Sequence, residues 1–127
     1  MSQDEGERLV RSLWKLFEAR RWDDAAELLA EDFVAEWPHS SERIRGRHNF
    51  IELNRTYPEG WSIRVDRVVS AGSVVFSEIT VTQGDETFRT ASVFDVRDGL
   101  LSHAREYWVE EGSESHPERA RWTEPLE

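Results

Sequence analysis

The 127-residue chain has no cysteine and only four prolines, and it contains no long apolar run. Without cysteine there can be no disulfide framework, no thiol nucleophile and no thiolate metal site. No segment approaches the roughly 20 apolar residues of a membrane-spanning helix. The acidic start, Met1–Glu7, differs from a signal peptide. We therefore expect a cytoplasmic protein that does not associate with membranes.

Basic residues are scarce as well. Sixteen Lys and Arg stand against 26 Asp and Glu, which gives a formal net charge of −10. Nucleic-acid binding needs a basic surface that neutralises phosphates, so this class of partner is excluded. The four histidines show no metal-ligand spacing, and the chain has neither a glycine-rich phosphate loop nor a nucleophile elbow. We expect no metal and no cofactor.

The N-terminal half of the chain has the apolar periodicity of helices. Leu13 and Phe17 belong to an amphipathic pattern over residues 7–20. Asp24 and Glu27 have the spacing of a capping box for a second helix that ends near residues 31–32. A third helix is predicted from Arg47 to about residue 56, because Pro58 disfavours its continuation.

The remaining segments are typical of β-strands. A short strand pair is predicted over residues 33–37 and 42–45, and long strands over residues 63–69, 74–82, 87–96 and 100–109. This order indicates a single α+β domain over residues 1–127, in which three N-terminal helices pack on a curved antiparallel sheet of four long strands plus the short pair. Residues 110–127 form an acidic tail that we expect to be extended, with Trp122 as an anchor on the domain or on a partner subunit.

The last two strands flank Asp98-Gly99, a strong hairpin signal. A two-residue turn would pair Arg97 with Leu100. A three-residue turn with Gly99 as a bulge would pair Val96 with Leu100. Since a shift of one residue moves every side chain to the opposite face, the turn decides where Glu106 points.

The three-residue turn separates apolar from charged residues better, and we prefer it. It leaves Glu106 as the single acid on a face of apolar and small residues, with Phe88, Thr90, Ser92, Phe94, Val96, Leu100, Ser102, Ala104 and Trp108. The opposite face then carries Arg89, Asp95, His103, Arg105 and Tyr107.

Three stretches carry a family resemblance that covers nearly the whole chain, to about Val109. They are Arg21-Trp-Asp-Asp-Ala-Ala-Glu-Leu-Leu-Ala-Glu-Asp-Phe33, Ile44-Arg-Gly-Arg-His-Asn-Phe50, and Phe94-Asp-Val-Arg-Asp-Gly-Leu-Leu101 with Glu106-Tyr-Trp108. Together with the order of elements, they resemble the nuclear transport factor 2-like superfamily, and within it the SnoaL-like branch, which includes polyketide cyclases.

The resemblance implies a cone-shaped fold with a cavity between the concave sheet and the helices. It also implies a homodimer formed through the outer face of the sheet. It does not imply one activity, because the superfamily contains isomerases, epoxide hydrolases, cyclases, dehydratases and non-catalytic binding proteins.

Three residues are candidates for catalysis. Glu106 lies where members such as the limonene epoxide hydrolase type place a cavity carboxylate, and an apolar surrounding should raise its pKa towards the range of a general acid or base. Its alternative role is structural, pairing with an arginine or capping a backbone group. Glu78 would add a second carboxylate if it faced the cavity, although a solvent-facing position is favoured. His39 follows Pro38 at the expected cavity rim, and imidazole is the side chain that ordinarily titrates near neutral pH.

Aromatic residues are numerous for so short a chain, with six Trp, six Phe and two Tyr. Aromatic walls with a few polar groups are typical of small-molecule pockets, although the same residues can form a plain core. Asn54 could orient a ligand or hold the turn at Tyr57. The predicted ligand pocket consists of Trp14, Trp37, Asn54, Tyr57, Phe94 and Trp108.

Two hypotheses follow. The first is a cofactor-independent isomerase, cyclase or hydrolase that acts on a hydrophobic small molecule and uses Glu106 as general acid or base. The second is a non-catalytic dimeric module that binds a hydrophobic ligand or supports another protein.

Overall fold

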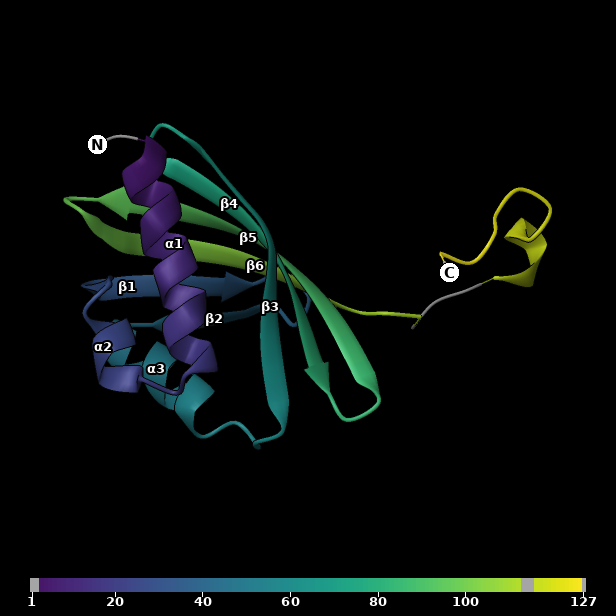
Figure 1. Ribbon diagram of the computed structural model, residues 1–127, viewed down its shortest axis with the longest axis horizontal. Coiled ribbons are helices and arrows are strands. Elements are labelled where there is room, and N and C mark those ends of the chain that lie inside the picture. The colour runs from purple at the N-terminus through teal and green to yellow at the C-terminus, as the bar shows by residue number, and fades with distance from the viewer. Residues whose placement is uncertain (1–2, 113–115, 127) are drawn as a thin grey trace.

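The computed structural model describes residues 3–112 and 116–126. Figure 1 shows helices covering one side of a curved sheet. The elements are α1 (Gln3–Glu18), α2 (Trp22–Ala26), β1 (Leu29–Trp37), β2 (Glu42–Arg45), α3 (Arg47–Arg55), β3 (Trp61–Ala71), β4 (Val74–Gln83), β5 (Glu86–Arg97), β6 (Leu100–Glu110) and the 3₁₀ turn η1 (Pro117–Arg119). The predicted α+β class is confirmed.

The six strands form one mixed sheet in the order β2-β1-β6-β5-β4-β3. Strands β3 to β6 are the predicted antiparallel set, and β1 and β2 are the predicted short pair. β1 also pairs with β6, in parallel. This pairing joins the short pair to the long strands, and it brings Trp37 of β1 to the same part of the sheet as Glu106 of β6.

The second helix is shorter than predicted. α2 ends at Ala26, its N-cap is Arg21, and no side-chain cap bond forms, so the expected capping box of Asp24 and Glu27 is wrong. β1 begins at Leu29 instead of Phe33. Leu29 and Phe33 are both fully buried, so this segment gains more from pairing with β6 than from another helical turn.

The hairpin turn also differs from the preferred prediction. Arg97 pairs with Leu100, and the central residues Asp98 and Gly99 have φ of 52° and 77°, as in a two-residue type I′ turn. The ladder then shifts, because Val96 pairs with Leu101 while Asp95 pairs with His103. The extra residue of β6, Ser102, is therefore a β-bulge.

Together the turn and the bulge place the side chains on the predicted faces of the sheet. This holds from the Asp95–His103 pair to the end of the hairpin that is far from the turn. Glu106 pairs with Ser92 and Trp108 pairs with Thr90, on the face that also holds Phe94. Leu100 is the exception, because Leu101 takes the core position that had been predicted for it. Arg89, Asp95, His103, Arg105 and Tyr107 lie on the opposite face as expected.

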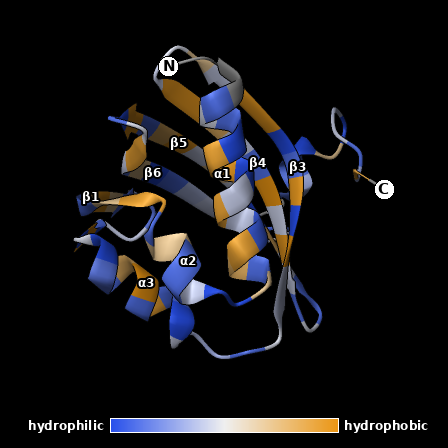
Figure 2. Cartoon of the chain, turned by 60° about the vertical axis from the view of Figure 1, so that its left-hand side comes forward, coloured by the Kyte–Doolittle hydropathy of each residue, from blue (hydrophilic) through white to orange (hydrophobic). Residues whose placement is uncertain are grey.

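The core lies between the concave face of the sheet and the helices. Figure 2 shows that α1 has alternating apolar and polar stripes, as expected for a helix with one buried side. α1 contacts β3 and β4, and α3 contacts β1 and β2. A Cβ at Gly6 of α1 would lie 2.9 Å from Cγ2 of Val75, so glycine permits close packing of this helix on β4.

The C-terminal segment contributes little to the domain. In Figure 1, residues 116–126 lie apart from the helices and the sheet. Trp122 is 74% exposed and stacks with Arg121 of its own segment, so it does not anchor the tail on the domain. Among the residues described, no helix is long and apolar enough to cross a membrane.

Candidate functional site

A cavity of about 370 Å³ lies between the concave sheet and the helices. Its walls are mainly aromatic and aliphatic, with Trp14, Phe17, Trp37, Phe50, Trp61, Ile63, Ile79, Val81, Phe88 and Trp108. Its polar lining residues are His39, Asn54, Tyr57, Gln83, Glu106 and Glu110. An apolar cavity with a few polar groups is the usual form of a small-molecule site.

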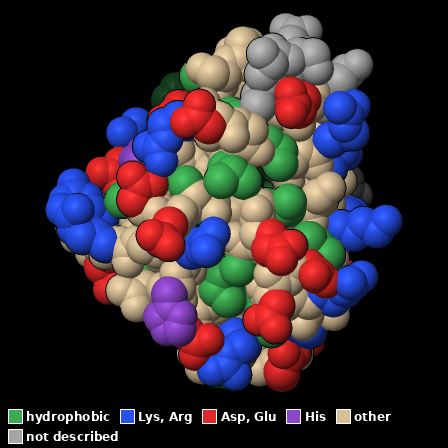
Figure 3. All heavy atoms as spheres, turned by 90° about the vertical axis from the view of Figure 1, so that its left-hand side faces the viewer, with side chains coloured by type: hydrophobic (Ala, Val, Ile, Leu, Met, Phe, Trp, Pro, Cys, Tyr) green, Lys and Arg blue, Asp and Glu red, His purple; other side chains and the backbone are tan. Residues whose placement is uncertain are grey.

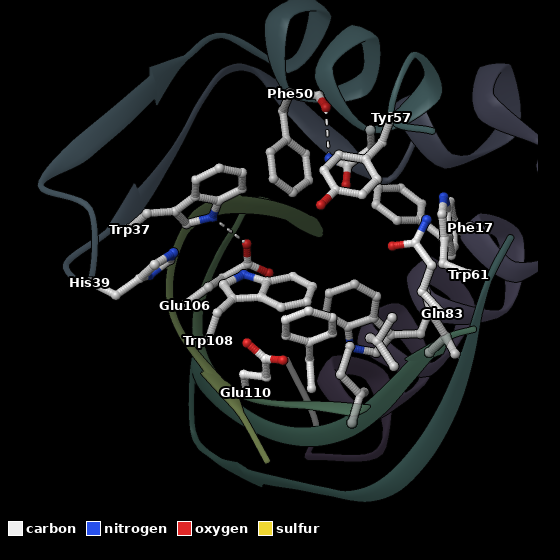
Figure 4. Close-up of a pocket in the computed structure, with 16 residues that line it drawn as sticks. Phe17, Trp37, His39, Phe50, Tyr57, Trp61, Gln83, Glu106, Trp108 and Glu110 are labelled. Carbon is white, nitrogen blue, oxygen red and sulfur yellow. Dashed lines mark hydrogen bonds between the residues drawn. The ribbon is translucent and has the colours of Figure 1, made fainter. Parts of the chain in front are cut away.

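Seven of the nine predicted site residues lie around this cavity. They are Glu106, His39, Trp14, Trp37, Asn54, Tyr57 and Trp108, which come from α1, α3, β6 and the segments near the ends of β1 and α3. Figure 4 shows Trp37, Glu106 and Trp108 at one end and Gln83 and Trp61 at the other. The fold thus gathers residues that are up to 94 positions apart in the chain (108 − 14).

Two predicted residues lie elsewhere. Glu78 is on the outer face of β4, where its carboxylate pairs with the Arg67 guanidinium at 3.2 Å, so it cannot act with Glu106 in one cavity. Phe94 has no exposed surface and is not part of the cavity wall. Its ring packs edge-on against Trp14, with centroids 6.0 Å apart, so Phe94 holds a wall residue in place without lining the cavity itself.

Glu106 is a charged residue of the core, with 2% of its surface exposed. The indole N–H of Trp37 donates to its Oε1 at 2.8 Å, and the Ser92 hydroxyl donates to its Oε2 at a longer 3.4 Å. The structural alternative named an arginine or a backbone group as the partner, and neither takes part in these two hydrogen bonds. Glu106 is therefore held by neutral donors, one from β1 and one from β5.

Burial raises the pKa of Glu106, because removal from water disfavours the charged carboxylate. The donors Trp37 and Ser92 oppose this effect, since they stabilise the ionised form. The Trp108 indole lies beside the same carboxylate and acts in the same direction, although its N–H makes no well-formed hydrogen bond. Desolvation is the largest effect, so the pKa is above its ordinary value. A raised pKa makes the carboxylate a stronger base, as a general base requires.

The raised pKa predicts a pH-dependent difference in stability between the wild type and the Glu106→Gln variant. Below the unfolded-state pKa of 4.5, Glu106 is protonated in the folded and in the unfolded protein. Its full contribution to the free energy of unfolding is then present. As the pH rises through the folded-state pKa, that contribution is lost, because the unfolded chain releases the proton more easily. Each tenfold difference between the two acidity constants is worth about 1.4 kcal/mol.

Urea unfolding of both proteins from pH 4 to 9 measures this effect. The free energy of unfolding of the wild type should fall relative to that of the variant as the pH rises. The surface carboxylates with pKa values lowered by arginines, such as Asp32 and Glu36, are present in both proteins and cancel. A constant difference across this range would show that burial does not perturb Glu106.

Gln83 is a polar wall residue that the sequence reasoning missed. Its Nε2 donates to the backbone oxygens of Pro58 and Glu59, at 3.0 and 3.4 Å. Only the NH₂ group can donate to a carbonyl, so these contacts set the orientation of the amide. Figure 4 shows its oxygen directed into the cavity. The predicted strand over residues 74–82 ended one residue before Gln83, and the pattern gave no signal for this role.

The other polar wall residues have simpler surroundings. Asn54 donates from Nδ2 to the oxygen of Phe50 at 2.8 Å, so its side chain bonds to its own helix instead of the Tyr57 turn. Tyr57 is 53% exposed, and Figure 4 shows its hydroxyl pointing inward. The ring of His39 is exposed and lies against Trp37, with centroids 5.9 Å apart. Within residues 3–112 and 116–126, no group of His, Cys, Asp and Glu could hold a metal ion.

Comparison with known proteins agrees with this geometry. The model of the SnoaL-like domain matches residues 10–104. The chain shares 32% identity with a putative ketosteroid isomerase from Kribbella flavida, covering 98% of this chain and 92% of that one with a TM-score of 0.90. It shares 26% identity with an LEH-like epoxide hydrolase of M. tuberculosis, covering 84% of each chain with a TM-score of 0.73.

A nuclear transport factor 2-like protein of unknown function from Burkholderia xenovorans has the same fold. It is 22% identical, covers 98% of this chain and 97% of that one, and has a TM-score of 0.82. No curated protein matches the chain. The family match spans residues 10–104, which is most of the chain. The chain therefore belongs to the SnoaL-like family, with a nuclear transport factor 2-like fold.

Proposed function

We propose that this protein is a cofactor-independent enzyme that moves a proton on a hydrophobic carbonyl compound, with Glu106 as the general base and acid. The observation that supports this most is the carboxylate of Glu106, which is buried in the wall of an aromatic cavity and held only by neutral donors. A buried carboxyl group without a cationic partner is suited to proton transfer, because burial raises its pKa and makes its carboxylate a stronger base.

The reaction needs only atoms that the ligand and the protein supply. The Glu106 carboxylate removes a proton from the carbon next to the carbonyl, and the C–H electron pair forms the C=C bond of an enolate. The resulting carboxylic acid returns the proton to another carbon of the conjugated system, which gives an isomer and restores the carboxylate. General acid–base catalysis of this kind contributes about 10²- to 10⁴-fold to the rate.

The enolate oxygen needs a hydrogen-bond donor. Tyr57 suits this role, since its hydroxyl points into the cavity in Figure 4. Trp37 performs a different task, because its N–H already binds Oε1 of Glu106 and orients the carboxylate. Glu106 is 2% exposed, so its hydrogen bond with Trp37 lies in a low-dielectric environment that strengthens it.

A set of β,γ-unsaturated ketones tests the proposal, beginning with 3-cyclohexen-1-one and a bicyclic homologue that fits the cavity. We expect conversion to the conjugated ketones, measured by ultraviolet absorbance, and incorporation of solvent deuterium at the transferred position. Absence of both in the presence of a bound ketone would contradict the proposal.

A specific observation favours the non-catalytic alternative. The Trp37–Glu106 hydrogen bond joins β1 to β6, so Glu106 has a structural task even without a reaction. In that case Glu106→Gln would keep ligand binding, since an amide oxygen can still accept from Trp37, and bound ligands would be recovered unchanged. Recovery of a chemically converted ligand would exclude this alternative.

We also propose that a second copy of the chain covers the outer face of the sheet. Val69, Phe76, Tyr107 and Val109 are 43–57% exposed there. Figure 3 shows acidic and basic side chains interspersed over another face of the molecule, with no basic patch on that face. An exposed apolar surface on the convex sheet is more typical of a protein interface than of a nucleic-acid site.

A further inference from the structure

The polar groups that the cavity offers a ligand are mostly hydrogen-bond acceptors. At the end opposite Glu106, the NH₂ group of the Gln83 amide donates to the backbone oxygens of Pro58 and Glu59. Its oxygen, directed into the cavity in Figure 4, is left to accept. Glutamine can present either a donor or an acceptor, and here the protein backbone has selected the acceptor.

The tryptophan donors of the cavity wall are not accessible, which leaves the Tyr57 hydroxyl as the aromatic donor. The indole nitrogens of Trp61 and Trp108 are enclosed by protein atoms and have no hydrogen-bond partner. The indole nitrogen of Trp14 donates to Ser77, and that of Trp37 donates to Glu106. None of the four indole N–H groups is therefore free to bind a ligand oxygen.

Two acidic residues and one histidine, His39, line the cavity. Glu106 and Glu110 belong to its lining, and among the residues described no Lys or Arg does. Arg20 stacks on the Trp61 ring, 3.5 Å from its centroid, but its guanidinium pairs with Glu59 at 2.9 Å. An anionic ligand would thus lose its hydration without gaining a cation, which is unfavourable. A cationic ligand could approach both the carboxylates and the faces of the aromatic rings.

We propose that the substrate is a neutral or amine-bearing hydrophobic molecule whose hydroxyl or ammonium group donates to Gln83, and that carboxylates and phosphate esters are rejected. This proposal rests on the proposed function in one respect, because it takes the reacting end of the ligand to lie at Glu106. It specifies the opposite end of the ligand. Glu110, which lies beside Trp108 in Figure 4, adds a preference for the amine over the alcohol through its negative charge and not through a contact at Gln83.

Four probes on one skeleton test this inference: 2-naphthylmethanol, its methyl ether, 2-naphthylmethylamine and 2-naphthoate, titrated into the full chain by calorimetry at pH 7. Because the alcohol makes one net hydrogen bond that the ether lacks, it should bind about two- to twelvefold more tightly than the ether. The amine should bind at least as well as the alcohol, and the carboxylate should bind more weakly than the ether.

Two variants locate the interactions. Gln83→Met has a similar volume and no amide, so it should remove the advantage of the alcohol while leaving the affinity for the ether unchanged. The ether is thus an internal control for an intact cavity. Glu110→Gln should reduce only the preference for the amine. Equal binding of alcohol and ether by the wild type, tight binding of naphthoate, or an unchanged alcohol preference in Gln83→Met would each overturn the proposal.

The outcome is separate from that of the catalytic proposal. Glu106→Gln lies at the other end of the cavity and should keep the preference for the alcohol over the ether. If the ketones are not isomerised but the alcohol preference depends on Gln83, the binding inference stands and the catalytic one fails. If ketones are isomerised but no donor preference is found, the reverse holds.

Discussion

Glutamine in place of Glu106 is expected to lower the rate of proton transfer to the β,γ-unsaturated ketones by about 10²- to 10⁴-fold. The amide cannot accept a proton from carbon, but its size is nearly the same and its oxygen can still accept from Trp37, as Oε1 does at 2.8 Å. The affinity for the ketone should therefore change little. Initial rates by ultraviolet absorbance, with kcat and KM measured separately, distinguish the two effects.

Ser92→Ala is the matched control for this substitution. Ser92 touches the same carboxylate but only through a long contact of 3.4 Å, so its loss should reduce kcat by a few-fold at most. If Glu106→Gln keeps the activity of the wild type while both variants are folded, Glu106 is a structural residue and the catalytic account is wrong.

Phe33→Ala is expected to cost about 3–5 kcal/mol of folding free energy, as is usual for a phenylalanine with no exposed surface. The Phe33 ring on β1 packs against Phe50 of α3, with centroids 4.9 Å apart. Phe50 lines the cavity, so the same substitution should also weaken the packing of the cavity wall at Phe50. Such a loss is a large fraction of the 5–15 kcal/mol that typically stabilises a domain. Urea unfolding measures it.

Phe76→Ala supplies a control with the same chemical change. Phe76 lies on the outer face of the sheet and is 46% exposed, so its removal from an isolated domain should cost about 1 kcal/mol or less. In the homodimer proposed above the loss at Phe76 would be larger, so this control is measured at a protein concentration where gel filtration shows a monomer. A small loss at Phe33 would contradict the packing described for α3.

The fold could be predicted largely from local patterns. Apolar residues at helical spacing identified α1 and α3, and alternation of apolar and polar residues identified β3 to β6. The pairing of β1 with β6 was not predictable in this way, because a parallel contact between distant segments leaves no local signal. For the same reason, the exchange of helix for strand at Leu29 was missed.

The hairpin shows how a prediction can be correct at one level and wrong at another. The separation of apolar from charged residues correctly identified the face on which Glu106 lies. It did not locate the bulge, because a bulge at the turn and a bulge further along the strand place the later side chains on the same faces. Asp98 and Gly99 take positive φ in the two-residue turn, and the bulge lies at Ser102. Composition alone does not distinguish these arrangements.

The candidate site was predictable to a similar extent. Glu106 could be identified from the sequence because it is the single acid on an apolar face. The sequence did not show which face of β4 is concave, so it could not decide whether Glu78 points into the cavity. Gln83 became recognisable only through the backbone oxygens of Pro58 and Glu59, to which its amide is bound across the α3–β3 connection. Such contacts depend on tertiary structure and leave no trace in the strand pattern.

The central claim is that Glu106 is a buried, proton-exchanging carboxyl group, and a titration of its side-chain carboxyl carbon by ¹³C NMR tests it most directly. Comparison of the wild type with Glu106→Gln assigns the signal. We expect the pKa of Glu106 to lie above the ordinary value of 4.5, because burial outweighs the donors Trp37 and Ser92. A pKa at or below 4.5 would show that burial does not raise the pKa of Glu106 and would contradict the account.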